Sequence, residues 1–528
     1  MNTLSNRFGR CGICALLLAA LTGSAAQPDS EALHWLQRAE GYYQQQDWKR
    51  SQEAAEQALQ RDPHLAGALV ILALVETNQA QLDQAEKHLR AAAAIQPNDP
   101  RIRSYLGSTL LREQKYQEAE AEFKTVLRLD QGNVVAAYNL GLIALAGRKP
   151  ADAKARFRRV LDVHPSDLPA RLGVLECDLM LVNKAAVAST LRSIDALLPA
   201  GDPERLRLAA TLMGYGEFEH AIAVLEKLRT VHPGLYDVHY VLALANLRAG
   251  RTEPAAARAQ EAIRIQPLAA AYHLLAAIRE KQNQTGEAID NYAKAAALEP
   301  RNEDYRLDYA SAVLEHGKAG EAAALWTAAC RDFPQSWRML IGSGAASFLT
   351  GDSEGAVNQL LRAAQLNPDA QRAYALLGQL YELAPRQSNE IEQALADYAH
   401  RRPGDASALY HYGRIQYLKA ASGAANFDSA SQSLRQALAI NPHLAEASLQ
   451  LGIVAQAQGQ VAESAKLLQQ AVHDDPKLAD AHYRLGLVYR KLGLVAQSKA
   501  EMALFEKLRA DPSASLAHQT VKQLSTVR

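Results

Sequence analysis

Aromatic side chains are scarce in this chain of 528 residues. Phe, Trp and Tyr together make up 6% of the sequence, although 48% of its residues are hydrophobic. Runs of β-branched residues are also few, so the apolar content is mostly alanine and leucine, which favour helices. The composition therefore predicts an all-α protein whose helices pack closely.

Net charge is absent as well. Lys and Arg number 57 and so do Asp and Glu, which makes the formal net charge zero. Proteins that bind nucleic acids need a basic surface, and helices that lie on membranes carry an excess of Lys and Arg. The balance therefore excludes nucleic acid as an expected partner and gives no support to a membrane-surface role.

Cysteine is rare, with four residues in the whole chain. Cys11 and Cys14 lie in an apolar stretch near the N-terminus, and the other two, Cys177 and Cys330, are 153 positions apart in apolar helical segments. This is not the dense pattern of a disulfide-stapled domain. We expect Cys177 and Cys330 to be buried free thiols.

The first 26 residues have the order of a secretory signal peptide. Arg7 and Arg10 precede the apolar run CGICALLLAALTG, and the small residues Ser24 and Ala26 follow it. The run is shorter than the about 20 residues that span a membrane, so an uncleaved anchor is the less favoured alternative. We predict a signal peptide over residues 1–26 and a short linker over 27–31. The mature chain is then periplasmic or secreted and has no transmembrane span.

The rest of the chain is periodic. Thirteen prolines recur at intervals of 34 residues or close to it, with one interval of two units: Pro63, Pro97, Pro165, Pro199, Pro233, Pro267, Pro300, Pro334, Pro368, Pro403, Pro442, Pro476 and Pro512. Proline pushes the preceding residue out of the helical region, so each marks the end of a helix. The register predicts about 14 units.

Most units also carry a small residue about 24 positions before the proline. It is glycine in seven of them: Gly107, Gly141, Gly344, Gly378, Gly413, Gly452 and Gly486. Twelve residues later stands a second small residue, such as Ala119 or Ala153. Small residues let two helices approach closely, and the dispersion energy of this close packing offsets the helix penalty of glycine. Each unit is therefore predicted to be a tightly packed helix pair.

These landmarks resemble those of the tetratricopeptide repeat family. The fourth unit carries them as Leu140, Gly141, Ala153, Phe157, Val160 and Pro165. The resemblance implies an α-solenoid, a right-handed superhelix of about 14 helix-turn-helix repeats. Repeats 1–11 occupy residues 32–403, and repeats 12–14 occupy 404–512 after irregular turns. Residues 513–528 are a C-terminal cap or tail.

Three units depart from the pattern. The fifth has Leu175 at the small position and is followed by AGDPE, the eleventh contains the turn ELAPRQSNE, and the twelfth has an insertion around KAASGAANFD. Because each repeat contacts mainly its neighbours, we expect these departures to alter the coupling between repeats or the curvature.

No catalytic motif stands out. The segment GSGAAS, residues 342–347, lacks the last glycine and the preceding strand of a nucleotide-binding loop. The 15 histidines are scattered, and no spacing proposes a metal or other cofactor. Since repeats fill nearly all of the chain, the protein is predicted not to be an enzyme.

The resemblance also implies where a partner binds. In the family, the first helix of each repeat lines the concave face, and five of its positions tend to meet the ligand. In this sequence they give the candidates Tyr138, Leu142, Tyr240, Arg248, Tyr410, Arg414, Tyr417, Tyr483, Arg490 and Lys491. Tyrosine and arginine are enriched at binding hot spots. The alternative is that some of these tyrosines only pack between adjacent first helices.

We therefore predict an exported, non-catalytic scaffold that binds a protein or peptide on its concave face. The alternative is a periplasmic component of an exopolysaccharide secretion or envelope-assembly system, with polysaccharide or envelope machinery as partner. The sequence does not identify the partner.

We expect the mature protein to begin near Gln27 and to be located outside the cytoplasm, because small residues end the apolar leader. Mass spectrometry of the N-terminus of protein purified from its native cells measures this. Residues 1–26 intact in protein from the cytosolic fraction would contradict the expectation.

Overall fold

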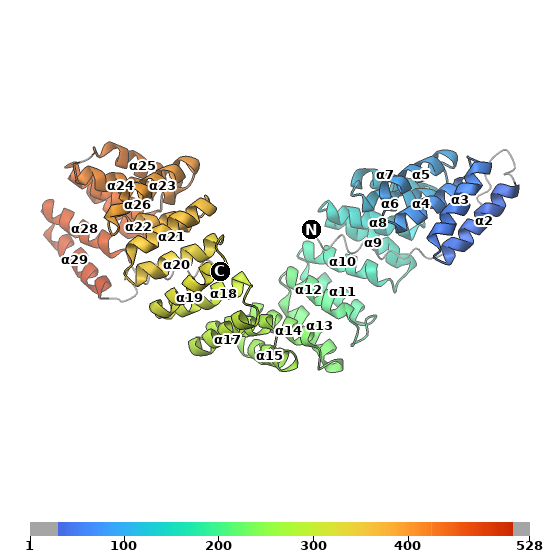
Figure 1. Cartoon of the computed structure of the whole chain (residues 1–528), viewed down its shortest axis with the longest axis horizontal. Helices are drawn as coiled ribbons and strands as arrows, with labels where there is room; N and C mark the ends of the chain where they lie inside the picture. Colours follow the sequence, from blue (N-terminus) through green and yellow to red (C-terminus); the bar gives the residue numbers. More distant parts are fainter. Residues whose placement is uncertain (1–29, 424, 511–528) are drawn as a thin grey trace. The chain divides into compact units, whose positions relative to one another are not determined.

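The computed structural model describes residues 30–423 and 425–510. The predicted signal peptide, most of the predicted linker and the C-terminal tail lie outside this range. Over the described residues the chain forms 28 α-helices and one short 3₁₀-helix, without a strand. The all-α fold class is confirmed, and the helices form 14 successive pairs (Figure 1).

The chain divides into two compact units, one ending at Pro233 and the other beginning at Gly234. Unit 1 contains α2 (Ser30–Gln44), α3 (Trp48–Arg61), α4 (Ala66–Asn78), α5 (Leu82–Ile95), α6 (Pro100–Arg112), α7 (Tyr116–Leu129), α8 (Val134–Ala146), α9 (Pro150–Val163), α10 (Leu168–Met180), α11 (Lys184–Asp195), α12 (Glu204–Gly214) and α13 (Phe218–Val231).

Unit 2 continues the same pattern of helix pairs. It contains α14 (Tyr236–Arg248), α15 (Thr252–Ile265), α16 (Ala269–Lys281), α17 (Thr285–Leu298), α18 (Glu303–Glu315), α19 (Ala319–Asp332), α20 (Trp337–Leu349), α21 (Ser353–Leu366), α22 (Gln371–Leu380), η2 (Pro385–Gln387), α23 (Ser388–Arg401), α24 (Ala406–Ala421), α25 (Asp428–Ile440), α26 (Ala445–Ala457), α27 (Val461–Asp474), α28 (Ala479–Lys491) and α29 (Val495–Arg509).

The periodic prolines end the second helices, as predicted. In the fourth repeat α9 stops at Val163, two residues before Pro165, and the intervening His164 is no longer helical. The same two-residue offset recurs at most of the described repeats. Proline disfavours a helical conformation at the residue before it, but α7 ends with the same offset before Gln131, where the repeat has no proline.

Six of the seven glycines at the small position face the second helix of their own repeat, and Gly378 is the exception. A Cβ atom on Gly141 would lie 2.7 Å from the Phe157 ring, and one on Gly107 would lie 2.9 Å from the Phe123 ring. The second small position lies directly opposite. Where the second small residue is serine, its hydroxyl donates a hydrogen bond to the backbone of the first small residue. Ser464 Oγ, for example, donates to the Gly452 carbonyl oxygen at 2.7 Å. The predicted close approach of the two helices is confirmed.

The Phe157 ring also accounts for a glycine outside the small positions of the repeat pattern, Gly173. A Cβ on Gly173, in the first helix of the next repeat, would also lie 2.7 Å from the Phe157 ring, so this ring is held between two glycines. Trp326 has the same relation to Gly342, whose Cβ would lie 2.5 Å from the indole. Residues 342–347 are therefore an interior part of α20 that packs against a large aromatic side chain.

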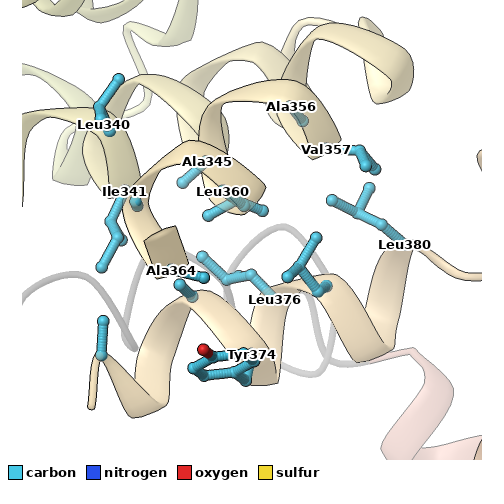
Figure 2. Packing of buried hydrophobic residues seen from close by; sticks show 14 of the residues in the cluster. Leu340, Ile341, Ala345, Ala356, Val357, Leu360, Ala364, Tyr374, Leu376 and Leu380 are labelled. Atoms are coloured by element: carbon cyan, nitrogen blue, oxygen red, sulfur yellow. The ribbon is translucent and has the colours of Figure 1, made fainter. Parts of the chain in front are cut away.

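The buried hydrophobic residues of each unit form clusters that extend across repeat boundaries. Figure 2 shows Val357 and Ala364 of α21 beside Leu380 and Leu376 of α22, which belongs to the next repeat. Such a chain of nearest-neighbour contacts gives a solenoid its stability. Cys177 is a buried free thiol, as expected, whereas the free thiol of Cys330 is only half-buried. Burial raises the pKa of both.

The first helices form an inner layer within each unit. They contact the first helices of neighbouring repeats, as in α2 with α4, α8 with α10, and α14 with α16. They are also more buried: eleven of the thirteen residues of α4 are buried, but only three of the fourteen residues of α9. The second helices consequently cover the outside, and side chains on the first helices line the inner face.

The turn inside thirteen of the fourteen described repeats has a left-handed backbone conformation at one residue. Glycine supplies it in seven described repeats, for example Gly216 with φ of 78°. Six other repeats use a residue with a side chain, among them Gln46, Gln114, Arg148 and Val182. A β-branched residue is least suited to this conformation, yet Val182 adopts φ of 54°.

The irregular fifth repeat has a weak junction to its successor. α11 stops four residues before Pro199, and it makes almost no contact with α12. Instead the guanidinium of Arg205, which is 2% exposed, donates to the Pro199 carbonyl oxygen at 2.8 Å and to Asp195 at 2.9 Å. A buried charge thus connects the helices where apolar packing is lacking.

The other two irregular repeats lie in unit 2. In the eleventh, α22 has only ten residues and is followed by the 3₁₀-helix Pro385–Gln387. In the twelfth, α24 is extended to sixteen residues by part of the inserted segment. The inserted residues therefore lengthen the inner layer at α24.

Replacing Gly141 by alanine is expected to destabilise unit 1 by about 2 kcal/mol, because the new methyl group meets a Phe157 ring that Gly173 already confines. The midpoint of chemical denaturation measures this. Gly41→Ala is the matched control: Gly41 is also helical, and nothing lies within 4 Å of its Cβ site. It should stabilise by up to about 1 kcal/mol. Equal shifts for both variants would contradict the packing argument.

Val182→Gly is expected to raise stability by about 1 kcal/mol, since it removes a strained left-handed valine. Little packing is lost, because Val182 is 77% exposed. The reverse change at the equivalent turn, Gly216→Val, should lower stability by a similar amount. Thermal melting of both variants tests the pair, and a loss of stability in Val182→Gly would show that the turn is not strained.

Candidate functional site

Nine of the ten predicted partner-binding residues reach solvent or the inner face from first helices. Tyr138 lies on α8, Tyr240 and Arg248 on α14, Tyr410, Arg414 and Tyr417 on α24, and Tyr483, Arg490 and Lys491 on α28. Their placement on first helices agrees with the inner layer described above.

Leu142 is the exception, and the prediction that it binds a partner is wrong. It is 2% exposed and belongs to a buried cluster with Val174 and Cys177 of the next repeat. Its side chain therefore has no surface to offer a partner. The register placed it on the ligand-facing side, but the approach of α10 covers that part of α8.

Tyr138 and Tyr483 pack against the second helices of their own repeats. The Tyr138 ring lies edge-on to Phe157, with 5.5 Å between ring centroids, and the Tyr483 ring lies 5.0 Å from that of Phe505. Tyr417 similarly lies 6.0 Å from Phe427, beside the inserted turn of the twelfth repeat. These contacts give all three tyrosines a packing role.

The predicted arginines divide into two kinds. Arg414 is engaged within the fold, because it donates to the Gly378 carbonyl oxygen at 2.8 Å and to Glu382 at 2.6 Å. Arg248, Arg490 and Lys491 are exposed, and their side chains form no hydrogen bond or ion pair with the residues that the structure describes. Arg414 therefore joins α24 to α22, whereas the other three cations keep their charge open to solvent.

Tyr240 belongs to an aromatic cluster on three successive first helices of unit 2. Tyr240 stacks on Tyr236 with centroids 5.7 Å apart, and His273 of α16 lies 4.9 Å from Tyr305 of α18. We call Tyr236, Tyr240, His273 and Tyr305 the inner tyrosine cluster. Burial, with Tyr240 and Tyr305 nearby, raises the pKa of Tyr236 to about 12. The phenols therefore stay protonated at neutral pH and can donate hydrogen bonds.

The Tyr236 hydroxyl is the notable group of this cluster. Its oxygen is buried and has no hydrogen-bond partner among the described residues. Most buried polar groups in proteins are hydrogen-bonded, and leaving one unpaired costs about 1–3 kcal/mol. His273, by contrast, is held by Asp308 at 2.6 Å. The cluster therefore combines a fixed imidazole with one unsatisfied hydroxyl.

A second polar group without a partner lies beside Tyr410. The Nδ1 atom of His411 is buried, accepts no hydrogen bond from the described residues, and sits 2.6 Å from the Cβ site of Gly378. Burial, reinforced by Arg414, lowers the pKa of His411 to about 4, so the ring is neutral at pH 7. Burial raises the pKa of Tyr410 to about 12. Gly378 thus makes room for His411 on α24, the first helix of the next repeat, and not for the second helix of its own repeat.

The sequence prediction missed Tyr236, His273 and Tyr305. His273 stands at the same register position as Tyr240, one repeat later, so the period itself would have identified it. Tyr236 and Tyr305 occupy other positions of their helices. Only the packing of α14, α16 and α18 shows that they join the cluster.

Unit 1 carries a different feature, a groove of about 1980 Å³. It follows the ends of α6, α8 and α10, where first helices turn into second helices, and the exposed faces of α7 and α9. Tyr215, after α12, also lines it. None of the predicted partner-binding residues lines it.

Within the described residues, no group of three or more His, Cys, Asp or Glu side chains is placed to hold a metal ion. Of the described helices, none has the length and apolar character needed to cross a bilayer.

The repeats match tetratricopeptide repeat family models over most of the chain. A model described as "Tetratricopeptide repeat" matches residues 42–107 and 110–175, and a second with the same description matches 206–270, 273–337 and 348–406. A model described as "TPR repeat" matches residues 456–493. Together these segments cover more than half of the sequence, and the chain belongs to the tetratricopeptide repeat family. Its fold is a scaffold suited to protein–protein interaction.

Two characterised relatives share parts of the sequence. A type IV pilus assembly protein, PilF of Pseudomonas aeruginosa, is 27% identical over 168 residues, which are 29% of this chain and 66% of that protein. The human protein O-mannosyl-transferase TMTC3 is 27% identical over 103 residues, 19% of this chain and 11% of that protein. The chain therefore spans less than two thirds of either relative.

Solved structures of low sequence identity are also similar. One chain in the crystal structure of the APC/C complex Cut9–Hcn1 is similar over 94% of this chain and 96% of its own length, at 14% identity and a TM-score of 0.33. Pseudomonas aeruginosa PilF covers 40% of this chain with 97% of its own, at 20% identity and a TM-score of 0.34.

Proposed function

We propose that this protein is an exported scaffold, without catalytic activity of its own, that binds a protein or peptide partner on the inner face of its first helices. The observation that carries the proposal is the inner tyrosine cluster with its unpaired Tyr236 hydroxyl. Export is supported by the order of the first 26 residues.

The cluster has the properties of a binding anchor. Its tyrosines offer a large apolar surface and a hydroxyl, the combination found at interface hot spots. Tyr236 and Tyr240 are half-buried, so part of each ring reaches solvent while the fold restrains its rotamers. Because the buried Tyr236 hydroxyl forms no hydrogen bond with the described residues, turning the ring outward to bond with a partner would break no hydrogen bond within them.

An assembly role is the second candidate. The partial similarity to a type IV pilus assembly protein favours a partner that is itself a subunit of a larger assembly. The exopolysaccharide version of this alternative has no supporting observation among the described residues.

The first test asks where the partner lies. A photocrosslinking amino acid placed at Tyr240, on the inner face, should capture a discrete partner in native cells. The same residue placed at Thr327, an exposed position of the second helix α19, should not. Crosslinking at Thr327 with none at Tyr240 would move the binding surface to the outer layer.

Once the partner is identified, the variant Tyr236→Phe measures the contribution of the Tyr236 hydroxyl alone to binding. The change removes an unpaired buried group, so the denaturation midpoint should stay equal or rise. Affinity should fall about fivefold to tenfold if the hydroxyl bonds to the partner. Tyr240→Ala should weaken binding about thirtyfold, and Thr327→Ala should leave it unchanged. Wild-type affinity in both tyrosine variants, measured by titration calorimetry, would remove the cluster from the interface.

A further inference from the structure

We propose that the groove of unit 1 is a second docking site, which binds an acidic, partly apolar peptide segment. The groove shares no residue with the inner tyrosine cluster, so the proposal goes beyond the function above. It follows from the charge around the groove and the apolar side chains that line it.

The groove has an excess of positive charge in a chain that has none overall. Six cationic side chains line it: Arg112, Lys124, Arg148, Lys149, Arg156 and Arg159. Three carboxylates do so, namely Glu120, Asp152 and Glu176. Lys124 and Glu120 form an ion pair with each other at 2.6 Å, so they cancel. The field in the groove is therefore positive although the formal net charge of the chain is zero.

Most of the cations remain able to pair with a partner's carboxylates. Arg112 and Arg159 bond to the backbone oxygens of Thr77 and Gln131, which carry no formal charge and so do not neutralise the guanidinium groups. The side chains of Arg148, Lys149 and Arg156 form no hydrogen bond or ion pair with the described residues. Arginine pairs with carboxylates through two parallel hydrogen bonds, so these side chains favour an acidic ligand.

Apolar side chains also line the groove. Ile143, Ala144 and Leu145 of α8 line it, together with Met180 at the end of α10 and Tyr215 after α12. Methionine adapts to ligand shapes, and tyrosine adds flat contact area. A segment that alternates acidic and apolar side chains matches both parts of the groove.

The same chemistry disfavours other anionic ligands. The three carboxylates would repel the closely spaced phosphates of a nucleic acid, whose binding requires a strongly basic surface. An acidic polysaccharide would satisfy the cations but would leave the apolar side chains without a complementary surface. Both remain outcomes of the experiment below.

The probe is a fluorescein-labelled peptide of glutamate, serine and leucine, about 12 residues long so that its extended length, at about 3.3 Å per residue, exceeds the length of one repeat helix. It is titrated against the full-length protein by fluorescence anisotropy. We expect binding that weakens as salt is raised. A matched peptide with glutamine in place of glutamate should bind at least about tenfold more weakly.

The variant Arg148→Gln/Lys149→Gln/Arg156→Gln tests the site. Glutamine suits the left-handed turn at Arg148, because Gln46 and Gln114 adopt φ of 60° and 63° at the equivalent turns. Affinity for the glutamate peptide should fall about tenfold, since each exposed ion pair contributes modestly.

The control variant Arg301→Gln/Arg331→Gln/Lys466→Gln removes the same charge from exposed positions of unit 2 and should bind the peptide like the wild type. Four results would each overturn the proposal: no binding by the wild type up to about 1 mM protein; equal affinity for both peptides; an unaffected groove variant; or an equal loss in the control. Stronger binding of labelled alginate oligosaccharide or single-stranded DNA than of the peptide would assign the groove to that ligand class instead.

This experiment is independent of the inner face. Tyr236→Phe should bind the glutamate peptide normally, because Tyr236 does not line the groove. Failure of the groove proposal therefore leaves the inner-face proposal standing, and the reverse also holds.

Discussion

The close approach of two helices at one small residue is the constraint on which this structure depends. At Gly141 the second helix brings a phenylalanine ring to where a Cβ would lie, and similar contacts recur at the other small positions. A helix pair this tight leaves its remaining apolar surface on the sides, where only another pair can cover it. Stacking of repeats is therefore required for stability, and each repeat that is added also extends the surface available for binding.

Much of this architecture is readable from the sequence because it depends on local chemistry at a fixed period. The prolines and small residues predict helix ends and helix contacts, and the structure confirms both at Pro165 and Gly141. The left-handed turn position is harder to recognise, although Gly216 and its equivalents mark it in seven repeats. Non-glycine residues such as Gln46 interrupt the glycine pattern there and hide it.

The candidate site was harder to predict, because exposure depends on the neighbouring repeat as well as on register. Leu142 and Tyr240 stand at nearby positions of equivalent helices, yet one is covered and the other is not. What covers Leu142 is the fifth repeat, which packs closely because Gly173 accommodates the Phe157 ring. Likewise Arg414 has the right position for binding, but its side chain bonds to Gly378 of the preceding first helix and to Glu382, just after that helix. Such contacts between repeats cannot be predicted from the sequence of one repeat alone.

Charge neutrality of the whole chain says little about any one surface of a solenoid. In a compact domain opposite charges are never far apart, but in a linear array each surface is built from two or three repeats. Screening at physiological salt limits charge interactions to about 8 Å, less than the length of one repeat helix. The carboxylates of distant repeats therefore cannot neutralise the cations around α9. For the same reason the inner tyrosine cluster and the groove can act separately, and a scaffold of this kind acquires independent binding sites simply by varying a few exposed residues in each repeat.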